Sequence, residues 1–278
     1  MRLGGPIFTE FTGPEDWVVA ARATGYTAVY CPARYGAEDE VVGAYARAAA
    51  KAHIVIAEVG AWSNPISPDE QERNRSLTLC KEQLALADRI GARCCVNISG
   101  ARGDRWDGHY AANLTQNTFD LIVDSVREII DDAGPLRTFY TLETMPWMYP
   151  DSVDSYVRLL EAIDRKQFGV HLDPANLINS PERFYGNADL LRECFAKLGP
   201  HIKSCHAKDV SMRQEFMVHI DEVRPGLGSL DYGVYLRELD RLPPDTPLMM
   251  EHLSDGEDYD RAAEYIRSVA AQEGVKIR

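Results

Sequence analysis

The sequence predicts a (β/α)8 barrel, formed by residues 1–278 as a single domain. Three observations predict this fold class. Eight short apolar runs alternate with longer amphipathic helical patterns. The length of 278 residues is close to the roughly 250 that one such barrel needs. No linker, low-complexity run or shift in composition divides the chain, so the repeating units belong to one body.

The eight apolar runs are the predicted strands. Each has four to seven residues and is bounded by glycine, proline or polar residues, which is typical of parallel strands buried on both faces. The predicted strands are Leu3–Thr9, Ala28–Cys31, Ile54–Glu58, Cys94–Ile98, Thr138–Glu143, Phe168–Asp173, Ile202–His206 and Leu248–Glu251.

The segments between these strands carry the signals of helix ends. Ser67 is the expected N-cap of one helix, and Gly91 is suited to the left-handed position after its last turn. Asn113 is the expected cap of a helix that runs towards Gly134, and Asp151–Asp154 open another. The last helix has apolar residues at helical spacing, at Tyr259, Ala262, Ala263, Ile266 and Val269.

An open, doubly wound sheet is the structural alternative to a barrel. Such folds often bind dinucleotides through a glycine fingerprint after the first strand. Here Leu3–Pro6 contains two glycines but no further G-x-x-G follows. The missing fingerprint argues against a dinucleotide-binding sheet, and eight units favour closure into a barrel.

The composition is that of an acidic globular protein. With 30 Lys+Arg and 43 Asp+Glu the formal net charge is −13, which argues against nucleic-acid partners bound through their phosphates. No window approaches about 18 consecutive apolar residues, so no membrane partner is expected. No export signal is visible, and the six cysteines form no CxxC pair, so we expect reduced, mostly buried thiols in a cytoplasmic protein.

Four successive predicted strands end in a metal-ligating residue type. These residues are Glu143, Asp173, His206 and Glu251. Functional groups of such barrels lie at the carboxyl ends of the strands, and charged side chains are rarely buried unless they are paired or bind a metal. Three carboxylates and one imidazole suit Mn²⁺, Mg²⁺ or Co²⁺, with Zn²⁺ as a further candidate. The alternative, four unrelated residues at loop starts, does not explain why they end consecutive strands.

Short motifs around these residues resemble a known family. They are Glu143, Val170–Asp173, His206–Asp209, the loop Arg224–Gly228, and Glu251. Together with the architecture they resemble the xylose-isomerase-like TIM barrels, which include sugar isomerases, ketose 3-epimerases and inosose dehydratases.

The resemblance implies a ligand set and a chemistry. Glu143, Asp173, His206 and Glu251 would bind one divalent cation, with Mn²⁺ as our first choice. The two glutamates would flank the substrate and act as acid and base, and Arg224 would reach substrate oxygens.

The sequence departs from this family at several positions. Asn176 stands where many members have a histidine that contacts substrate, and Leu227 stands where many have an acid. The strand ends Ala57–Gly60 and Asn97–Ser99 lack the histidines of the three-zinc endonucleases on this fold. Together with the negative charge, this argues against DNA repair.

Paired carboxylates beside a cation are suited to proton abstraction next to a carbonyl. The cation stabilises the enediolate charge, and a carboxylate on each face can remove and return a proton. We therefore predict an isomerase or epimerase of a sugar, keto-sugar or polyol. The alternative is a lyase on the same scaffold, such as an inosose or dehydroshikimate dehydratase or a C-glycoside-cleaving enzyme. A third hypothesis is a non-catalytic sugar- or metal-binding barrel.

Further residues are candidates for binding a small carbohydrate substrate. His171 lies two residues before Asp173, so it faces the same barrel interior. It is a candidate substrate contact or base, or else a core histidine. Lys208 would hold a substrate oxygen or pair with a neighbouring acid. Glu58 would bind hydroxyls across the mouth or anchor a loop, and Trp106 is the preferred aromatic contact. Asn176 completes this set, and a homo-oligomer or assembly with another subunit stays open.

Overall fold

The computed structural model describes all 278 residues and confirms the (β/α)8 barrel. One all-parallel sheet has the strand order β3-β2-β1-β11-β8-β7-β6-β5-β4. Its strands are β1 (Arg2–Gly5), β2 (Ala28–Val29), β3 (Val55–Ile56), β4 (Glu58–Gly60), β5 (Cys94–Asn97), β6 (Tyr140–Glu143), β7 (Phe168–Leu172), β8 (Ile202–Ala207) and β11 (Pro247–Met250). Each lies in or overlaps one of the predicted apolar runs.

The sheet closes because β3 and β4 are two parts of one strand, interrupted at Ala57. The Ala57 amide donates to the carbonyl of Val29 in β2 at 2.8 Å, and the Ala57 carbonyl accepts from the amide of Cys94 in β5 at 3.2 Å. The same segment therefore pairs with both ends of the strand order. Eight strands form the barrel, which is the number that the apolar runs predict.

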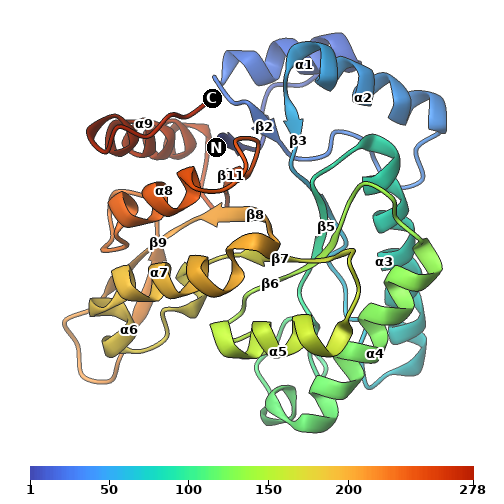
Figure 1. Cartoon of the computed structure of the whole chain (residues 1–278), viewed down its shortest axis with the longest axis vertical. Coiled ribbons are helices and arrows are strands. Elements are labelled where there is room, and N and C mark those ends of the chain that lie inside the picture. Colours follow the sequence, from blue (N-terminus) through green and yellow to red (C-terminus); the bar gives the residue numbers. More distant parts are fainter.

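Helices surround the strands on the outside of the barrel (Figure 1). They are α1 (Pro14–Ala23), α2 (Asp39–Ala52), α3 (Glu70–Ile90), α4 (Gln116–Ala133), α5 (Val153–Ile163), α6 (Pro181–Tyr185), α7 (Asn187–Leu198), α8 (Tyr232–Asp240) and α9 (Gly256–Gln272). Their apolar faces and the outward faces of the strands form one core of 61 buried residues. Burial of this apolar surface stabilises the single domain.

Two predicted helix caps are wrong, and in each case a nearby residue takes the role. Asp69, rather than Ser67, is the N-cap of α3, because the Ser67 hydroxyl accepts the Asp69 amide and closes a turn before the helix. Thr115, rather than Asn113, caps α4. The buried Asn113 side chain instead accepts the amide of Arg102 at 2.8 Å, which fixes the loop after β5.

The other predicted helix ends are confirmed. Ser152 caps α5 and accepts the amide of Ser155, as a residue in extended backbone before a helix can do. Gly91 and Gly134 follow α3 and α4 with φ of 77° and 55°, the left-handed conformation that glycine adopts without a steric cost.

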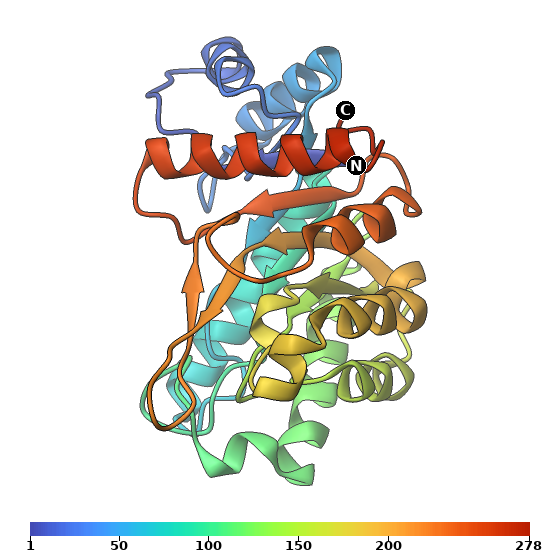
Figure 2. The same cartoon turned by 90° about the vertical axis from the view of Figure 1, so that its left-hand side faces the viewer.

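An antiparallel hairpin follows β8 and is absent from the sequence prediction. Its strands are β9 (Asp209–Met212) and β10 (Ile220–Val223), and it extends away from the barrel as the orange ribbon of Figure 2. The exposed side chains of Phe216, Met217 and Val218 lie near its tip. Only Lys208 separates β8 from β9, so the sequence pattern of the barrel strand runs directly into the hairpin.

All six cysteines are free, and all except the half-buried Cys31 are buried, as predicted. None of the helices combines the length and the apolar character that crossing a membrane requires.

Gly4 in β1 allows close approach of two neighbouring strands. A Cβ at this position would lie 2.2 Å from the carbonyl oxygen of Ala28 and 2.7 Å from the sulfur of Met249. The carbonyl belongs to the β1–β2 pairing and cannot move without disturbing it. We expect Gly4→Ala to lower the free energy of unfolding by about 1–3 kcal/mol, measured by urea denaturation.

Gly43→Ala in α2 is the matched control for this prediction. Its Cβ would meet only the flexible end of Arg47, at 3.1 Å, and alanine favours a helix by about 1 kcal/mol relative to glycine. This variant should be as stable as the parent or more so. An unchanged denaturation midpoint for Gly4→Ala would contradict the packing argument.

Candidate active site

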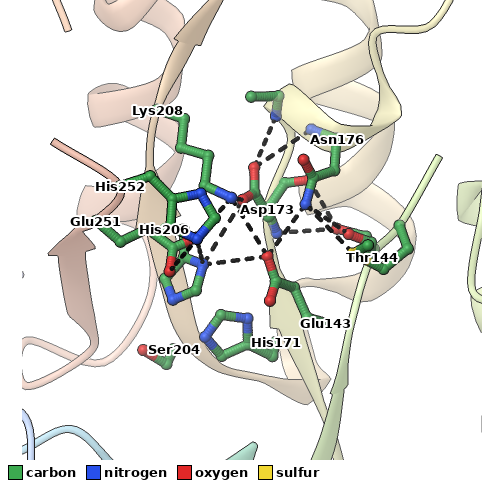
Figure 3. Close-up of polar contacts among 12 residues, drawn as sticks. Glu143, Thr144, His171, Asp173, Asn176, Ser204, His206, Lys208, Glu251 and His252 are labelled. Atoms are coloured by element: carbon green, nitrogen blue, oxygen red, sulfur yellow. Dashed lines mark hydrogen bonds and ion pairs between the residues drawn. The ribbon is translucent and has the colours of Figure 1, made fainter. Parts of the chain in front are cut away.

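The carboxyl ends of four neighbouring strands bring the predicted ligand residues together (Figure 3). Glu143 ends β6, Asp173 follows β7, His206 lies in β8 and Glu251 follows β11. One possible ligand atom from each residue lies within 4.8 Å of the ligand atoms of the other three. Glu143, Asp173 and His206 are buried, and the Glu251 side chain is 14% exposed. We call these four residues the carboxylate cluster.

One ring nitrogen of His206 faces all three carboxylates. Its Nδ1 lies 2.7 Å from Glu251 Oε1, 3.3 Å from Glu143 Oε1 and 3.6 Å from Asp173 Oδ2. Burial opposes a charged imidazole, but the negative charges of Glu251 and Glu143 outweigh burial and raise the pKa of His206 well above its usual value. Excess negative charge therefore surrounds this nitrogen.

Lys208 brings a positive charge to the same oxygens. Its Nζ lies 2.8 Å from Asp173 Oδ2, 2.5 Å from Glu251 Oε1 and 3.6 Å from Glu143 Oε1, and its side chain is only 2% exposed. Burial disfavours the ammonium, but Asp173 and the two glutamates raise the pKa of Lys208 well above its usual value. We expected Lys208 to hold a substrate oxygen or to pair with a neighbouring acid. The structure shows ion pairs with Asp173 and Glu251.

The donor set fits a divalent cation. Asp173 Oδ2 and Glu251 Oε1 are buried oxygens of the cluster, and their contacts there are the ion pairs with Lys208 and His206. As a metal ligand His206 would be neutral, and the three carboxylates and one ammonium would then leave two negative charges, which a divalent cation would balance. Oxygen donors with one imidazole suit Mn²⁺, Mg²⁺, Co²⁺ or Zn²⁺.

The loop after β7 holds Asp173 and Glu143 in place. Asp173 Oδ1 accepts the backbone amides of Ala175 and Asn176, and the Thr144 hydroxyl donates to the Asp173 carbonyl at 2.7 Å. The Asn176 amide nitrogen donates to Glu143 Oε1 at 3.1 Å. One oxygen of Asp173 is thus used by the backbone and the other points into the cluster. Asn176 lies beside the cluster and orients Glu143.

Glu58 lies beneath the carboxylate cluster rather than at the barrel mouth. Its side chain is 1% exposed, and Oε1 lies 2.9 Å from His171 Nε2 and accepts the hydroxyl of Ser204. Its Oε2 lies 3.4 Å from Nε2 of His206, the ring nitrogen opposite the one that faces the cluster. A carboxylate on the far nitrogen of a ligand histidine fixes the tautomer and the ring orientation.

Burial and charge act in opposite directions on Glu58. Burial alone would raise the pKa of this carboxyl, but His171 and His206 lower the pKa well below its usual value. Glu58 is therefore an anion in the barrel interior. His171 packs edge-on against His206, with ring centroids 4.1 Å apart, so the structure places His171 in the layer below the cluster.

Two predicted substrate contacts, Arg224 and Trp106, have other neighbours in the structure. Arg224 Nε lies 3.3 Å from Asp258 Oδ1, and a guanidinium nitrogen of Arg224 donates to the Pro225 carbonyl. Trp106 is 39% exposed in the loop after β5. Neither forms a hydrogen bond or ion pair with a residue of the cluster.

Asp209 has a role that the sequence did not suggest. Its Oδ2 accepts the amides of Gly226 at 3.0 Å and Gly228 at 3.1 Å, and its Oδ1 accepts the amide of Leu230 at 2.9 Å. A Cβ on Gly228 would lie 2.2 Å from Asp209 Oδ1, so glycine is needed for this approach. Asp209 thus anchors the loop Arg224–Gly228 instead of pairing with Lys208.

Fold and site together define a (β/α)8 barrel with a carboxylate–histidine cluster at the carboxyl ends of its strands. Residues 18–269 match the family model of the xylose isomerase-like TIM barrel. The chain belongs to this family, which confirms the resemblance inferred from the motifs. Among curated proteins, no sequence matches significantly.

Solved structures share the fold at low sequence identity. D-psicose 3-epimerase from Clostridium cellulolyticum H10, with D-tagatose, is 15% identical with a TM-score of 0.70, covering 98% of this chain and 99% of that one. A probable 3-DHS dehydratase from Bacillus anthracis is 16% identical with a TM-score of 0.70, covering 97% of this chain and 99% of that one. A xylose isomerase-like TIM barrel protein from Mycobacterium smegmatis, in complex with magnesium, is 16% identical with a TM-score of 0.69, covering 98% and 97%.

Proposed function

We propose that this protein is a divalent-metal-dependent isomerase or epimerase of a sugar, keto-sugar or polyol. The observation that carries the proposal is the pair Glu143 and Glu251. They come from β6 and from the end of β11, and both have an oxygen within 3.3 Å of His206 Nδ1. Two carboxylates that meet from different strands can approach one substrate carbon from different sides.

The residues of this chain supply proton transfer and orientation. A bound divalent cation, held by Glu143, Asp173, His206 and Glu251, would stabilise the negative charge that develops on the substrate oxygen when a proton leaves the adjacent carbon. Burial would raise the pKa of Glu251, but His206 and then Lys208 lower it below its usual value, so this carboxylate is ionised and able to accept a proton.

The second glutamate would return the proton on the other face of the substrate. Asn176 donates to Glu143 Oε1 and holds that carboxylate in one orientation. An epimerase returns a proton to the same carbon on the opposite face, whereas an isomerase returns it to the neighbouring carbon, and both begin with the same abstraction. The fold neighbours include a D-psicose 3-epimerase and a 3-keto-D-glucoside 4-epimerase, which supports this class of substrate.

Lys208 favours one second candidate, a lyase on the same scaffold. Its ammonium lies 2.5 Å from Glu251 Oε1, where it could donate a hydrogen bond to a departing hydroxyl or aglycone. The probable 3-DHS dehydratase, which shares the fold, supports this class too. Product analysis by NMR in D2O separates the two, because epimerisation keeps all heavy atoms of the substrate and elimination loses water or an aglycone.

Metal removal tests the proposed function directly. We expect treatment with a chelator to abolish exchange of the carbon-bound proton of a keto-sugar in D2O, and added Mn²⁺ to restore it. The measurement is proton NMR on a panel of keto-sugars and inososes, with Mg²⁺, Co²⁺ and Zn²⁺ added in parallel. Exchange that is indifferent to both chelator and metal would refute metal dependence.

A further inference from the structure

A cleft of about 500 Å³ lies beside the carboxylate cluster, between the β9–β10 hairpin and the loops that follow β6 and β7. Six of its ten lining residues are apolar. Its apolar side chains include Trp147, Ile178, Val218 and Ile220, and its polar ones include Asn176 and Glu222.

The cleft adjoins the cluster on two sides. Asn176 lines the cleft and donates to Glu143 Oε1 at 3.1 Å. Glu222 lines it on the hairpin side and lies 3.3 Å from Nδ1 of His252, the residue after Glu251. A substrate whose reacting carbon lies between the two glutamates would therefore extend into this space.

The tryptophan of the cleft offers carbon rather than a hydrogen bond. The Trp147 indole N–H already donates to the carbonyl of Asp107 at 2.9 Å, and the ring of His109 packs edge-on against it, with centroids 6.1 Å apart. The indole is held in place, its donor is used, and the side chain is 39% exposed. A fixed, partly exposed aromatic surface is suited to an apolar ligand group.

The hairpin supplies the opposing apolar residues. Val218 is 55% exposed and Ile220 is half-buried, and both line the cleft together with the buried Ile178. A sugar hydroxyl placed against these side chains would lose hydrogen bonds to water without replacing them, whereas an aryl or alkyl group would lose none. The apolar side of the cleft therefore favours hydrocarbon over a sugar hydroxyl.

We propose that the substrate is amphipathic: a keto-sugar or polyol head lies at the carboxylate cluster, and an aryl or alkyl substituent lies in the cleft between Trp147 and the hairpin. The position of the head rests on the proposed function, whereas the apolar substituent rests on the cleft alone. The class of ligand is thus an aryl or alkyl glycoside rather than a free monosaccharide.

Matched pairs of glycosides test this proposal. The probes are the methyl and phenyl glycosides of glucose, galactose and xylose, with binding to the metal-loaded protein measured by calorimetry and by saturation-transfer NMR. For at least one sugar we expect the phenyl glycoside to bind about tenfold more tightly than the methyl glycoside, because its ring is buried. Saturation should be strongest on the ring protons.

Variants at the cleft locate the effect. Val218→Asp places a charge on the exposed hairpin without disturbing the core, and it should remove the phenyl preference while the affinity for methyl glycosides is unchanged. Trp147→Ala should act in the same direction. Phe216→Ser is the control, since Phe216 is fully exposed near the same tip and does not line the cleft.

The outcomes separate this proposal from the proposed function. Three outcomes would overturn the amphipathic substrate. Phenyl and methyl glycosides of every sugar could bind with equal affinity, or none of the six probes could bind. The third is a phenyl preference that survives both cleft variants. Glu143-dependent proton exchange without a phenyl preference would refute the amphipathic substrate alone. A phenyl preference that Val218→Asp removes, with no exchange on any keto-substrate, would refute the isomerase and support the cleft.

Discussion

Glu143→Gln is expected to lower turnover about a thousand-fold while the protein stays folded. Glutamine has nearly the same size and can still accept the hydrogen bond from Asn176, but it cannot carry the proton that Glu143 would return to carbon. Loss of one positioned acid or base typically costs about 10²–10⁴-fold in rate. The measurement is the rate of proton exchange or product formation, with the thermal unfolding curve as a check on folding.

Glu251→Gln is expected to have an effect of the same size, and the double variant should be little slower than either single one. Residues that act as a unit in one reaction give non-additive losses. Glu264→Gln, at an exposed position of α9, is the control and should keep the parental rate. A rate within tenfold of the parent in either single variant would show that the two glutamates are not the acid and base.

Glu58→Ala is expected to weaken cation binding by about 10–100-fold and to lower the free energy of unfolding by about 3–5 kcal/mol. The substitution leaves His171 Nε2 and the Ser204 hydroxyl without their buried acceptor, and it frees Nε2 of His206. Removing one member of a buried charged network costs more than the net value of the interaction. Calorimetric titration with Mn²⁺ and urea denaturation measure the two effects separately.

A conservative change distinguishes a positioning role of Glu58 from a merely structural one. Glu58→Gln keeps one acceptor oxygen and nearly the full volume, so we expect a smaller loss of stability than with alanine. The affinity for Mn²⁺ should still fall, because the anion that fixes the tautomer of His206 is gone. Unchanged Mn²⁺ affinity in both variants would show that Glu58 supports the fold and not the ligand histidine.

Much of the architecture could be predicted because it depends on local pattern. Each apolar run is long enough to show that its strand is buried on both faces, and eight runs in one chain are enough to close a barrel. The convergence of Glu143, Asp173, His206 and Glu251 follows from the same topology, because the carboxyl ends of parallel barrel strands meet at one mouth. The residue that ends each strand is therefore sufficient to predict that these four side chains meet.

Helix caps were less predictable, because a capping side chain has competing partners outside the helix. Ser67 and Asn113 have the chemistry of caps, yet the first closes a turn and the second holds a loop through Arg102. The choice between such partners depends on how the loops pack. The sequence pattern of one helix does not contain this information.

The sequence by itself determined a closed barrel with three carboxylates and a histidine at one end. Only the tertiary structure decided that Glu58 lies below this cluster, against His171 and His206, and that Lys208 lies within it. The depth of a side chain in the barrel depends on the stagger between distant strands, and Glu58 and Ser204 are 146 residues apart. The apolar cleft likewise depends on where the β9–β10 hairpin folds relative to the loops after β6 and β7, which no local pattern specifies.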